Sequence, residues 1–186
     1  MPSVDKLIKT LVDTKLIHDC NTMLDIGCGS GKMLGLLLDK YPSHHGIFYD
    51  SAEVISIIKQ QFVFMNIYER CKFTHGNFFV DIPENSDLFF MRYVLHNWSD
   101  EQAVIILKNC RNAMCNNARL LIIETINSDA NDNELRPLLD LNMFVIFGAR
   151  LRFIHEYEKL LNVAKLKLNK VIPVGLHESI LECYPI

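Results

Sequence analysis

Hydrophobic and polar positions along this chain define two alternating kinds of segment: short apolar runs typical of buried strands, and amphipathic stretches typical of helices. Segments with strand character predict five strands, at 22–26, 46–50, 71–75, 87–92 and 118–126. The clearest helical pattern lies between the last two of these runs, where Ala103, Ile106 and Cys110 recur on one helix face. This alternation predicts an α/β domain built on a largely parallel sheet.

The pattern changes after the fifth apolar run. Two helical segments are expected in succession, near 135–147 and near 154–165, and two strand-like runs follow at 167–174 and 178–184. Only three residues separate these last runs, which is enough for an antiparallel hairpin and too short for a parallel crossover. The sequence therefore predicts a mostly parallel seven-stranded sheet with an antiparallel last strand.

Composition favours one domain with one well-buried core, because the chain has 186 residues, of which 49% are hydrophobic and 22% charged. We expect a leading helix within 1–20 and a single folded core over 21–186. The formal net charge of -3 gives no electrostatic reason to expect a nucleic acid or an anionic membrane as partner. A small-molecule ligand fits this composition better.

The first residues of the chain carry charges at Asp5, Lys6, Lys9 and Asp13, unlike the apolar centre of a signal peptide. No stretch approaches the roughly 18 to 20 apolar residues that cross a bilayer, so a cytoplasmic location is expected. The six cysteines include no CxxC pair, and no Cys/His cluster has the spacing of a zinc site. We therefore expect reduced cysteines and no metal.

The stretch "LDIGCGSGKM", at 24–33, places Gly27, Gly29 and Gly31 directly after the first predicted strand. A strand, a glycine-rich turn and a helix start bring backbone N–H groups close to a ligand. A dinucleotide-binding fingerprint would need a further glycine where Lys32 stands. With Asp25 two positions before the first glycine, the stretch instead resembles motif I of the class I S-adenosylmethionine methyltransferases.

An acid is expected at the end of the next strand, where it can accept hydrogen bonds from both hydroxyls of a ribose. Asp50 stands there, at the end of "GIFYD". Both dinucleotide and S-adenosylmethionine sites use such an acid, so Asp50 indicates a nucleoside without choosing between the two. The closing hairpin favours the second, since a reversed final strand marks the methyltransferases that this chain resembles.

The fourth predicted strand runs into "FFMRYVLHNWSDEQ". Ser99 and Gln102 have the spacing of a capping box, which accounts for them as the start of the following helix. His96 stands just before that cap, near the carboxyl ends of the strands, where ligands bind in open α/β sheets. An imidazole there could take a proton from a bound hydroxyl group.

From "YPSHHGIFYD" through "GNFFVDIPENSDLFFMRYVLHNWSDEQ" to "RLLIIETI", the chain resembles the catalytic domain of small-molecule O-methyltransferases related to the caffeate and hydroxyindole enzymes. The resemblance extends from about Met23 to Glu182 and implies a Rossmann-like class I methyltransferase fold with S-adenosylmethionine as cofactor. It also implies that His96 is the general base for a substrate hydroxyl and that Glu124 orients the imidazole.

The same resemblance assigns further residues. Its implied cofactor contacts are Asp25, Gly27, Gly29 and Gly31 at the turn, Asp50 at the ribose, Asn77 and Phe78 near the adenine, and Arg92 close by. The implied acceptor contacts are Met91, Trp98, Met143 and Phe147. Thioethers and flat rings suit a planar aromatic acceptor, although helical spacing also fits core packing for some of these residues.

Three departures from the family pattern affect these expectations. Asn77 replaces an acid, although its amide oxygen can still accept a hydrogen bond. In "FGARLRF", Leu151 aligns with a family glutamate that would be a second carboxylate beside the base. Relatives also carry an N-terminal dimerisation domain, so we expect a homodimer or a separate partner that covers the acceptor site.

Four functions stay open at this point. The leading one is methyl transfer to a hydroxyl of a small, aromatic molecule. A protein of the same fold could instead bind S-adenosylmethionine and have lost or altered the transfer. A nicotinamide-dependent reductase is disfavoured by Lys32 and the closing hairpin. A non-enzymatic interaction domain would keep the fold as a scaffold.

Overall fold

The computed structural model describes residues 4–127, 151–175 and 178–186. Its sheet contains β1 (Thr22–Ile26), β2 (His45–Asp50), β3 (Cys71–His75), β4 (Leu88–Arg92), β5 (Arg119–Thr125), β6 (Leu166–Pro173) and β7 (Glu178–Pro185). The helices are α1 (Val4–Asp13), α2 (Lys32–Lys40), α3 (Ala52–Phe62), α4 (Asp100–Ala113) and α6 (Ile154–Val163), with short 3-10 turns η1 (Tyr68–Arg70) and η2 (Leu95–Asn97).

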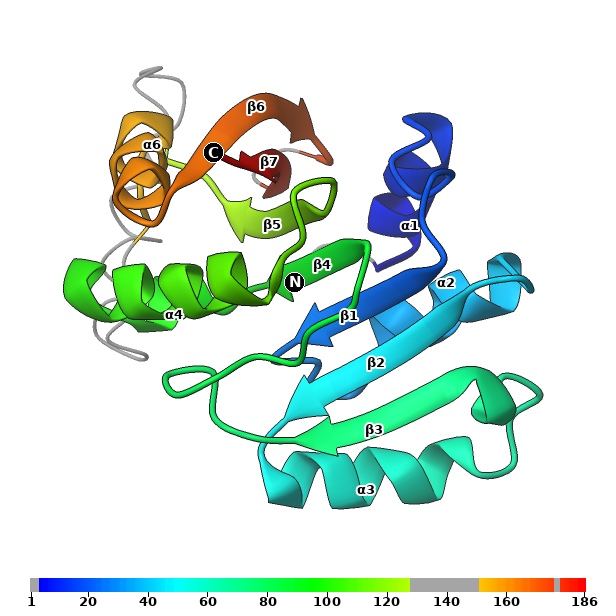
Figure 1. The fold of residues 1–186 in the computed structure, drawn as a ribbon. Helices are drawn as coiled ribbons and strands as arrows, with labels where there is room; N and C mark the ends of the chain where they lie inside the picture. Colours follow the sequence, from blue (N-terminus) through cyan, green and yellow to red (C-terminus); the bar gives the residue numbers. More distant parts are fainter. Residues whose placement is uncertain (1–3, 128–150, 176–177) are drawn as a thin grey trace.

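The seven strands form one sheet in the order β3-β2-β1-β4-β5-β7-β6 (Figure 1). Neighbouring strands from β3 to β5 pair in parallel, whereas β7 is antiparallel to both β5 and β6. The prediction of a mostly parallel sheet with a reversed last strand is therefore confirmed. The helix expected near 135–147 lies outside the described residues.

Helices cover both faces of the sheet, with α4 and α6 on one face and α1, α2 and α3 on the other (Figure 1). Phe89 and Phe90, neighbours in β4, are both completely buried, one in each of the two core clusters. Successive strand side chains point to opposite faces, so a sheet covered on both sides needs continuous apolar runs rather than alternation. This explains why apolar stretches mark the inner strands β1, β2, β4 and β5, whereas β3 at the sheet edge has no buried residue.

The carboxyl ends of the parallel strands meet at one edge of the sheet. Ile26 of β1 pairs with Tyr49 of β2, and Arg92 of β4 pairs with Ile123 of β5. The glycine turn, Asp50 and Glu124 follow or close these strands, so the topology brings them to the same edge.

No described helix is long and apolar enough to cross a membrane. In the same part of the chain, no group of three or more His, Cys, Asp or Glu side chains could hold a metal ion.

Candidate active site

The glycine turn after β1 has one open side. Gly31, with a φ of 68°, has no room for a side chain, because a Cβ would lie 3.0 Å from Cε1 of Phe48. Gly29, with a φ of 52°, differs: a Cβ there would meet nothing within 4 Å. Both residues need the left-handed backbone that glycine adopts without strain. The backbone at Gly29 is therefore the part of the turn that a ligand can approach.

Asp50 closes over this turn from the end of β2. Its Oδ2 accepts a hydrogen bond from the Gly29 N–H at 2.9 Å, and its Oδ1 accepts one from the Ser51 N–H at 2.7 Å. The turn is also tied to β2 through the Gly27 N–H, which donates to the carbonyl of Tyr49 at 2.8 Å. The structure thus brings together the acid and the glycine turn that sequence placed on separate strands.

Asp25 lies beneath the turn, with 2% of its surface exposed. Burial raises the pKa of this carboxyl to about 7, helped by the nearby Asp50 charge and opposed by the Arg92 guanidinium. A cationic ligand above the turn would favour the ionised form of Asp25. An acid of this kind suits the positively charged sulfur of S-adenosylmethionine.

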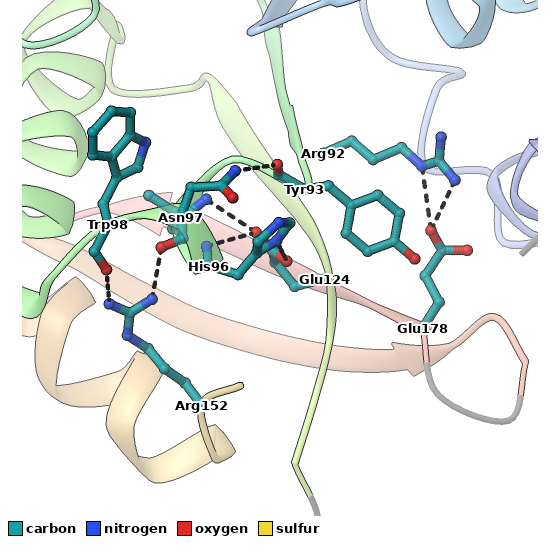
Figure 2. Close-up of polar contacts among 9 residues, drawn as sticks. Arg92, Tyr93, His96, Asn97, Trp98, Glu124, Arg152 and Glu178 are labelled. Carbon is teal, nitrogen blue, oxygen red and sulfur yellow. Dashed lines mark hydrogen bonds and ion pairs between the residues drawn. The ribbon is translucent and has the colours of Figure 1, made fainter. Parts of the chain in front are cut away.

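Arg92 makes contacts that the sequence did not predict. Its Nε and Nη2 both donate to Oε1 of Glu178 at 3.2 Å, and its guanidinium lies 4.9 Å from the ring centroid of Tyr93. Figure 2 shows Arg92 beside Glu178 and Tyr93, and its expected place close to the adenine stays a prediction. Through its charge, Arg92 still acts on Asp25.

An aromatic cluster follows β3. Asn77 accepts a hydrogen bond from the Phe79 N–H through its side-chain oxygen at 3.0 Å, which starts a tight turn. The Trp98 ring packs edge-on against Phe79, with centroids 4.7 Å apart, and lies 6.0 Å from Phe78. Trp98, expected on the acceptor side, therefore packs against the segment expected to hold the adenine.

His96 and Glu124 form the polar pair expected from the family resemblance. Nδ1 of His96 lies 2.8 Å from Oε2 of Glu124, whose side chain is completely buried. Oε1 of the same carboxylate accepts hydrogen bonds from the N–H groups of Leu95 at 3.0 Å and His96 at 3.4 Å. Because a carboxylate oxygen accepts hydrogen bonds, we assign the hydrogen of the neutral imidazole to Nδ1, which leaves a lone pair on Nε2.

Tyr93, which sequence reasoning missed, lies between His96 and the Arg92–Glu178 pair (Figure 2). Its φ of 55° is left-handed, and its ring centroid is 5.6 Å from that of His96. Burial, and then the Glu178 carboxylate, raise the pKa of Tyr93 to about 12, so the phenol stays protonated. A bulky residue in this backbone region is uncommon and concentrates at functional sites.

Arg152 is a second residue that the sequence did not single out. It is completely buried and donates to the Leu95 carbonyl at 2.8 Å, the Trp98 carbonyl at 2.6 Å and Oδ1 of Asp100 at 2.9 Å. The preceding Leu151 is half-buried, and its side chain offers no carboxylate to His96. The capping box predicted for Ser99 and Gln102 is confirmed at the start of α4.

The other residues expected at the acceptor are Met91, Met143 and Phe147. Met91 is completely buried in the core cluster under α4 and α6, so in this structure it packs within the core. Met143 and Phe147 lie outside the described residues.

Comparison of the sequence with known protein families agrees with this geometry. A family model described as an O-methyltransferase domain matches residues 3–166. The chain belongs to the O-methyltransferase family.

Individual O-methyltransferases agree with this assignment. The chain is 32% identical over 176 residues to the phenazine O-methyltransferase PhzM of Lysobacter antibioticus. The matched segment covers 95% of this chain and 52% of that protein. The crystal structure of the calicheamicin-biosynthesis methyltransferase CalO1 in its S-adenosylhomocysteine-bound form has a TM-score of 0.81 and 30% identity, over 89% of this chain and 49% of that one.

A human structure is similar as well. N-acetylserotonin methyltransferase in complex with S-adenosylmethionine has a TM-score of 0.83 and 26% identity, over 95% of this chain and 51% of that one. In each comparison the chain spans about half the length of the relative that it matches.

Proposed function

We propose that this chain transfers a methyl group from S-adenosylmethionine to a hydroxyl of a small aromatic molecule, with His96 as general base. The observation that carries the proposal is the His96–Glu124 pair, with Nδ1 and Oε2 2.8 Å apart, at the same sheet edge as the glycine turn in a member of the O-methyltransferase family. The phenazine enzyme among its relatives supports an aromatic acceptor.

The residues of the turn fit the cofactor. We assign the ribose hydroxyls to Asp50, the amino-acid end to the turn at Gly29, and the adenine to the segment of Asn77 and Phe78. Three features support this assignment: the open side of Gly29, the Asp50 carboxylate across it, and an Asn77 oxygen whose second lone pair can accept another hydrogen bond. When bound, S-adenosylmethionine would supply a methyl group attached to a positively charged sulfur. The carbon of this methyl group is electrophilic toward oxygen.

His96 accounts for the proton. The acceptor hydroxyl gives its proton to Nε2, because Nδ1 is turned toward Glu124. The imidazolium that forms is stabilised by the buried carboxylate, which also fixes the ring orientation. The carboxylate is itself held in place by the N–H groups of Leu95 and His96. General-base catalysis of this kind contributes about 10²- to 10⁴-fold to the rate.

A second function is favoured by Leu151, which stands where the family pattern has an acid. A chain with one carboxylate at the base could bind S-adenosylmethionine and have lost or altered the transfer. The two functions share cofactor binding and differ in turnover, so binding and turnover must be measured separately.

The first experiment is calorimetric titration of the purified chain with S-adenosylhomocysteine, with NADH as control. Micromolar binding of the first ligand alone, equivalent to about 8 kcal/mol, would support the assigned cofactor site. Binding of NADH alone, or of neither ligand, would overturn it.

The second experiment measures methyl transfer from labelled S-adenosylmethionine to a panel of hydroxylated aromatic compounds, comparing the wild-type chain with His96→Ala. We expect His96→Ala to lose at least about 100-fold in kcat and to keep its affinity for S-adenosylhomocysteine. Cofactor binding without turnover on any acceptor would favour the second function instead.

Assembly is a separate proposal. We propose that a second copy of the chain or a separate partner covers the acceptor site. The support is that the matched relatives are about twice as long as the matched segment. Light scattering coupled to gel filtration measures the mass in solution, and a monomer that turns over an acceptor without any partner would contradict the proposal.

A further inference from the structure

Arg152 lies in an environment where a charged side chain is rarely found. It has no exposed surface and is the largest of the completely buried side chains among the described residues. Burying a guanidinium is costly unless its N–H groups are hydrogen-bonded and its charge is paired. Arg152 meets both conditions through one short segment of the chain, from Leu95 in η2 to Asp100 at the start of α4.

The three acceptors of Arg152 flank His96 in the sequence. Nη1 bonds the carbonyl of Leu95, the residue directly before the imidazole, and Nη2 bonds the carbonyl of Trp98, two residues after it (Figure 2). Nε completes the set with the Asp100 carboxylate in the first turn of α4. Because Leu95 and Trp98 bound the turn η2, the guanidinium fixes the shape of the turn that carries His96.

Glu124 binds the same turn through the backbone N–H groups of the turn. Its Oε1 accepts the N–H groups of Leu95 and His96, whereas Arg152 binds carbonyls of the turn. The backbone around the imidazole is therefore bonded to an anion through its donors and to a cation through its acceptors. Such charge-assisted bonds are stronger than neutral ones.

The backbone of Arg152 is anchored independently of its side chain. Its carbonyl accepts a hydrogen bond from the N–H of Asn127 at 3.0 Å, just beyond the end of β5, which also carries Glu124. The next residue, Phe153, caps α6. Arg152 thus ties the turn of the base to the strand of its carboxylate partner.

We propose that Arg152 is a positioning residue for His96, holding η2 so that Nδ1 stays on Glu124 and Nε2 stays directed to the acceptor. This inference rests on the proposed function for its link to catalysis. Its structural part can be tested without an acceptor. That part states that the Arg152 guanidinium, through the backbone of η2, controls the orientation of the His96 ring.

Arg70 provides a matched control at another part of the molecule. It also donates to backbone carbonyls, those of His44 at 2.8 Å, Leu38 at 2.8 Å and Tyr41 at 3.2 Å. His44 is buried, and its Nε2 lies 3.2 Å from the Ile17 carbonyl, so its ring hydrogen is expected on the opposite nitrogen from that of His96. Each arginine therefore has a histidine reporter nearby.

The test compares Arg152→Lys and Arg70→Lys by nitrogen-15 NMR of labelled histidine, whose ring-nitrogen shifts report which nitrogen carries the hydrogen. We expect Arg152→Lys to shift the His96 signals toward a mixture of the two forms and leave those of His44 unchanged. Arg70→Lys should do the reverse. Unchanged His96 signals in folded Arg152→Lys, or equal changes in both variants, would overturn the inference.

A second variant covers the case in which Arg152→Lys does not fold. Asp100→Asn keeps the buried guanidinium but removes one charged partner, whose side chain is 43% exposed and so tolerates substitution more easily. We expect the His96 signals to move in the same direction and by less. Absence of any movement in Asp100→Asn would count against the inference on its own.

Titration of the same samples with S-adenosylhomocysteine separates this inference from the proposed function. We expect Arg152→Lys to bind it with wild-type affinity, because the contacts of Arg152 lie on η2 and α4 rather than at the glycine turn. If the wild-type chain does not bind S-adenosylhomocysteine, the proposed function fails, while the histidine spectra still decide the role of Arg152. A loss of binding in folded Arg152→Lys alone would show that Arg152 supports the cofactor site instead.

Discussion

Nδ1 of His96 lies 2.8 Å from Oε2 of Glu124, although the two residues come from different strand ends and are 28 positions apart in sequence. Glu124 is completely buried and its other oxygen is occupied by backbone N–H groups, so the carboxylate cannot rotate freely. The pair is therefore a fixed donor and acceptor rather than a surface ion pair. The hydrogen on His96 is directed by the protein before any substrate arrives.

Replacing Glu124 by glutamine should remove the contact that keeps the ring hydrogen of His96 on Nδ1. An amide NH₂ cannot accept from Nδ1–H, so the ring would turn or carry its hydrogen on Nε2, where it could no longer take a proton. We expect Glu124→Gln to lower kcat by about 10²- to 10⁴-fold and to leave the affinity for S-adenosylhomocysteine within about twofold. Steady-state kinetics with calorimetry measure both.

Glu182→Gln is the control for that substitution. Glu182 is also buried in the sheet, but its carboxylate accepts from Asn169 and Tyr184 away from His96. Its replacement should reduce stability without reducing kcat. Equal losses of kcat in both variants would mean that the effect of Glu124→Gln is general destabilisation.

The two glycines of the turn should respond differently to alanine. At Gly31 a methyl group would press on the Phe48 ring in a left-handed backbone, so Gly31→Ala should destabilise the fold by more than the roughly 1–2 kcal/mol of backbone strain alone. At Gly29 only the backbone strain applies, because its Cβ would stand in open space. Thermal unfolding of both variants measures the difference.

Gly29→Ala should nevertheless bind the cofactor poorly. The added methyl group would occupy the approach to the turn, and we expect at least about a tenfold loss of affinity for S-adenosylhomocysteine, about 1.4 kcal/mol. Wild-type affinity in Gly29→Ala would show that the ligand does not approach the turn from this side.

Asp25 should make stability depend on pH. Its folded pKa is about 7, above its ordinary value of 3.8, so between these values the folded chain binds more protons than the unfolded chain. The contribution of Asp25 to the free energy of unfolding is therefore fully present below its ordinary pKa and is lost as pH rises through about 7. Asp25→Asn should reduce the dependence of the free energy of unfolding on pH. At about pH 8 this variant should be more stable than the wild-type chain. Urea unfolding at several pH values would contradict this if both proteins gave the same slope.

The same group should distinguish two ligands of different charge. S-adenosylmethionine carries a positive sulfur that S-adenosylhomocysteine lacks, and a positive charge favours ionised Asp25. The affinity for the first relative to the second should therefore rise as pH increases through about 7, and Asp25→Asn should remove the increase. A constant affinity ratio in the wild-type chain would place Asp25 too far from the sulfur to interact with it.

Two serine caps offer a local test of the loop before α4. Ser99 accepts from the Gln102 N–H at 3.3 Å at the start of α4, and Ser51 accepts from the Val54 N–H at 3.5 Å at the start of α3. Replacement of either serine by alanine should cost about 1 kcal/mol. Only Ser99→Ala should also lower kcat, because it loosens the helix start next to η2. A similar loss of kcat in Ser51→Ala would contradict this local explanation.

The inner strands β1, β2, β4 and β5 were predictable because they are buried on both faces, which leaves apolar runs with clear ends. The glycine turn, Asp50 and His96 were likewise predictable, since each sits at a strand end that the pattern locates. Arg152 and Glu178 were not, because their roles depend on pairing between distant segments. Local periodicity does not report such pairs, and an arginine in a sequence is usually taken as a surface residue.

The left-handed backbone of Tyr93 was also invisible in the sequence. No glycine marks the position, and the conformation follows from the way β4 ends beside β5, where the Tyr93 N–H donates to the Ile123 carbonyl at 3.0 Å. Tertiary pairing, rather than local preference, sets this angle.

The position of β7 between β5 and β6 has a consequence for synthesis on the ribosome. β6 precedes β7 in the chain, yet among the described strands it pairs with β7 alone. During translation β6 therefore has no strand partner until β7 has been synthesised. The edge of β5 that pairs with β7 is open over the same period. Unpaired edges of this kind are the sites at which nascent chains associate with one another. The interval between synthesis of β5 and of β7 is thus a period in which the edge of β5 is open to other chains.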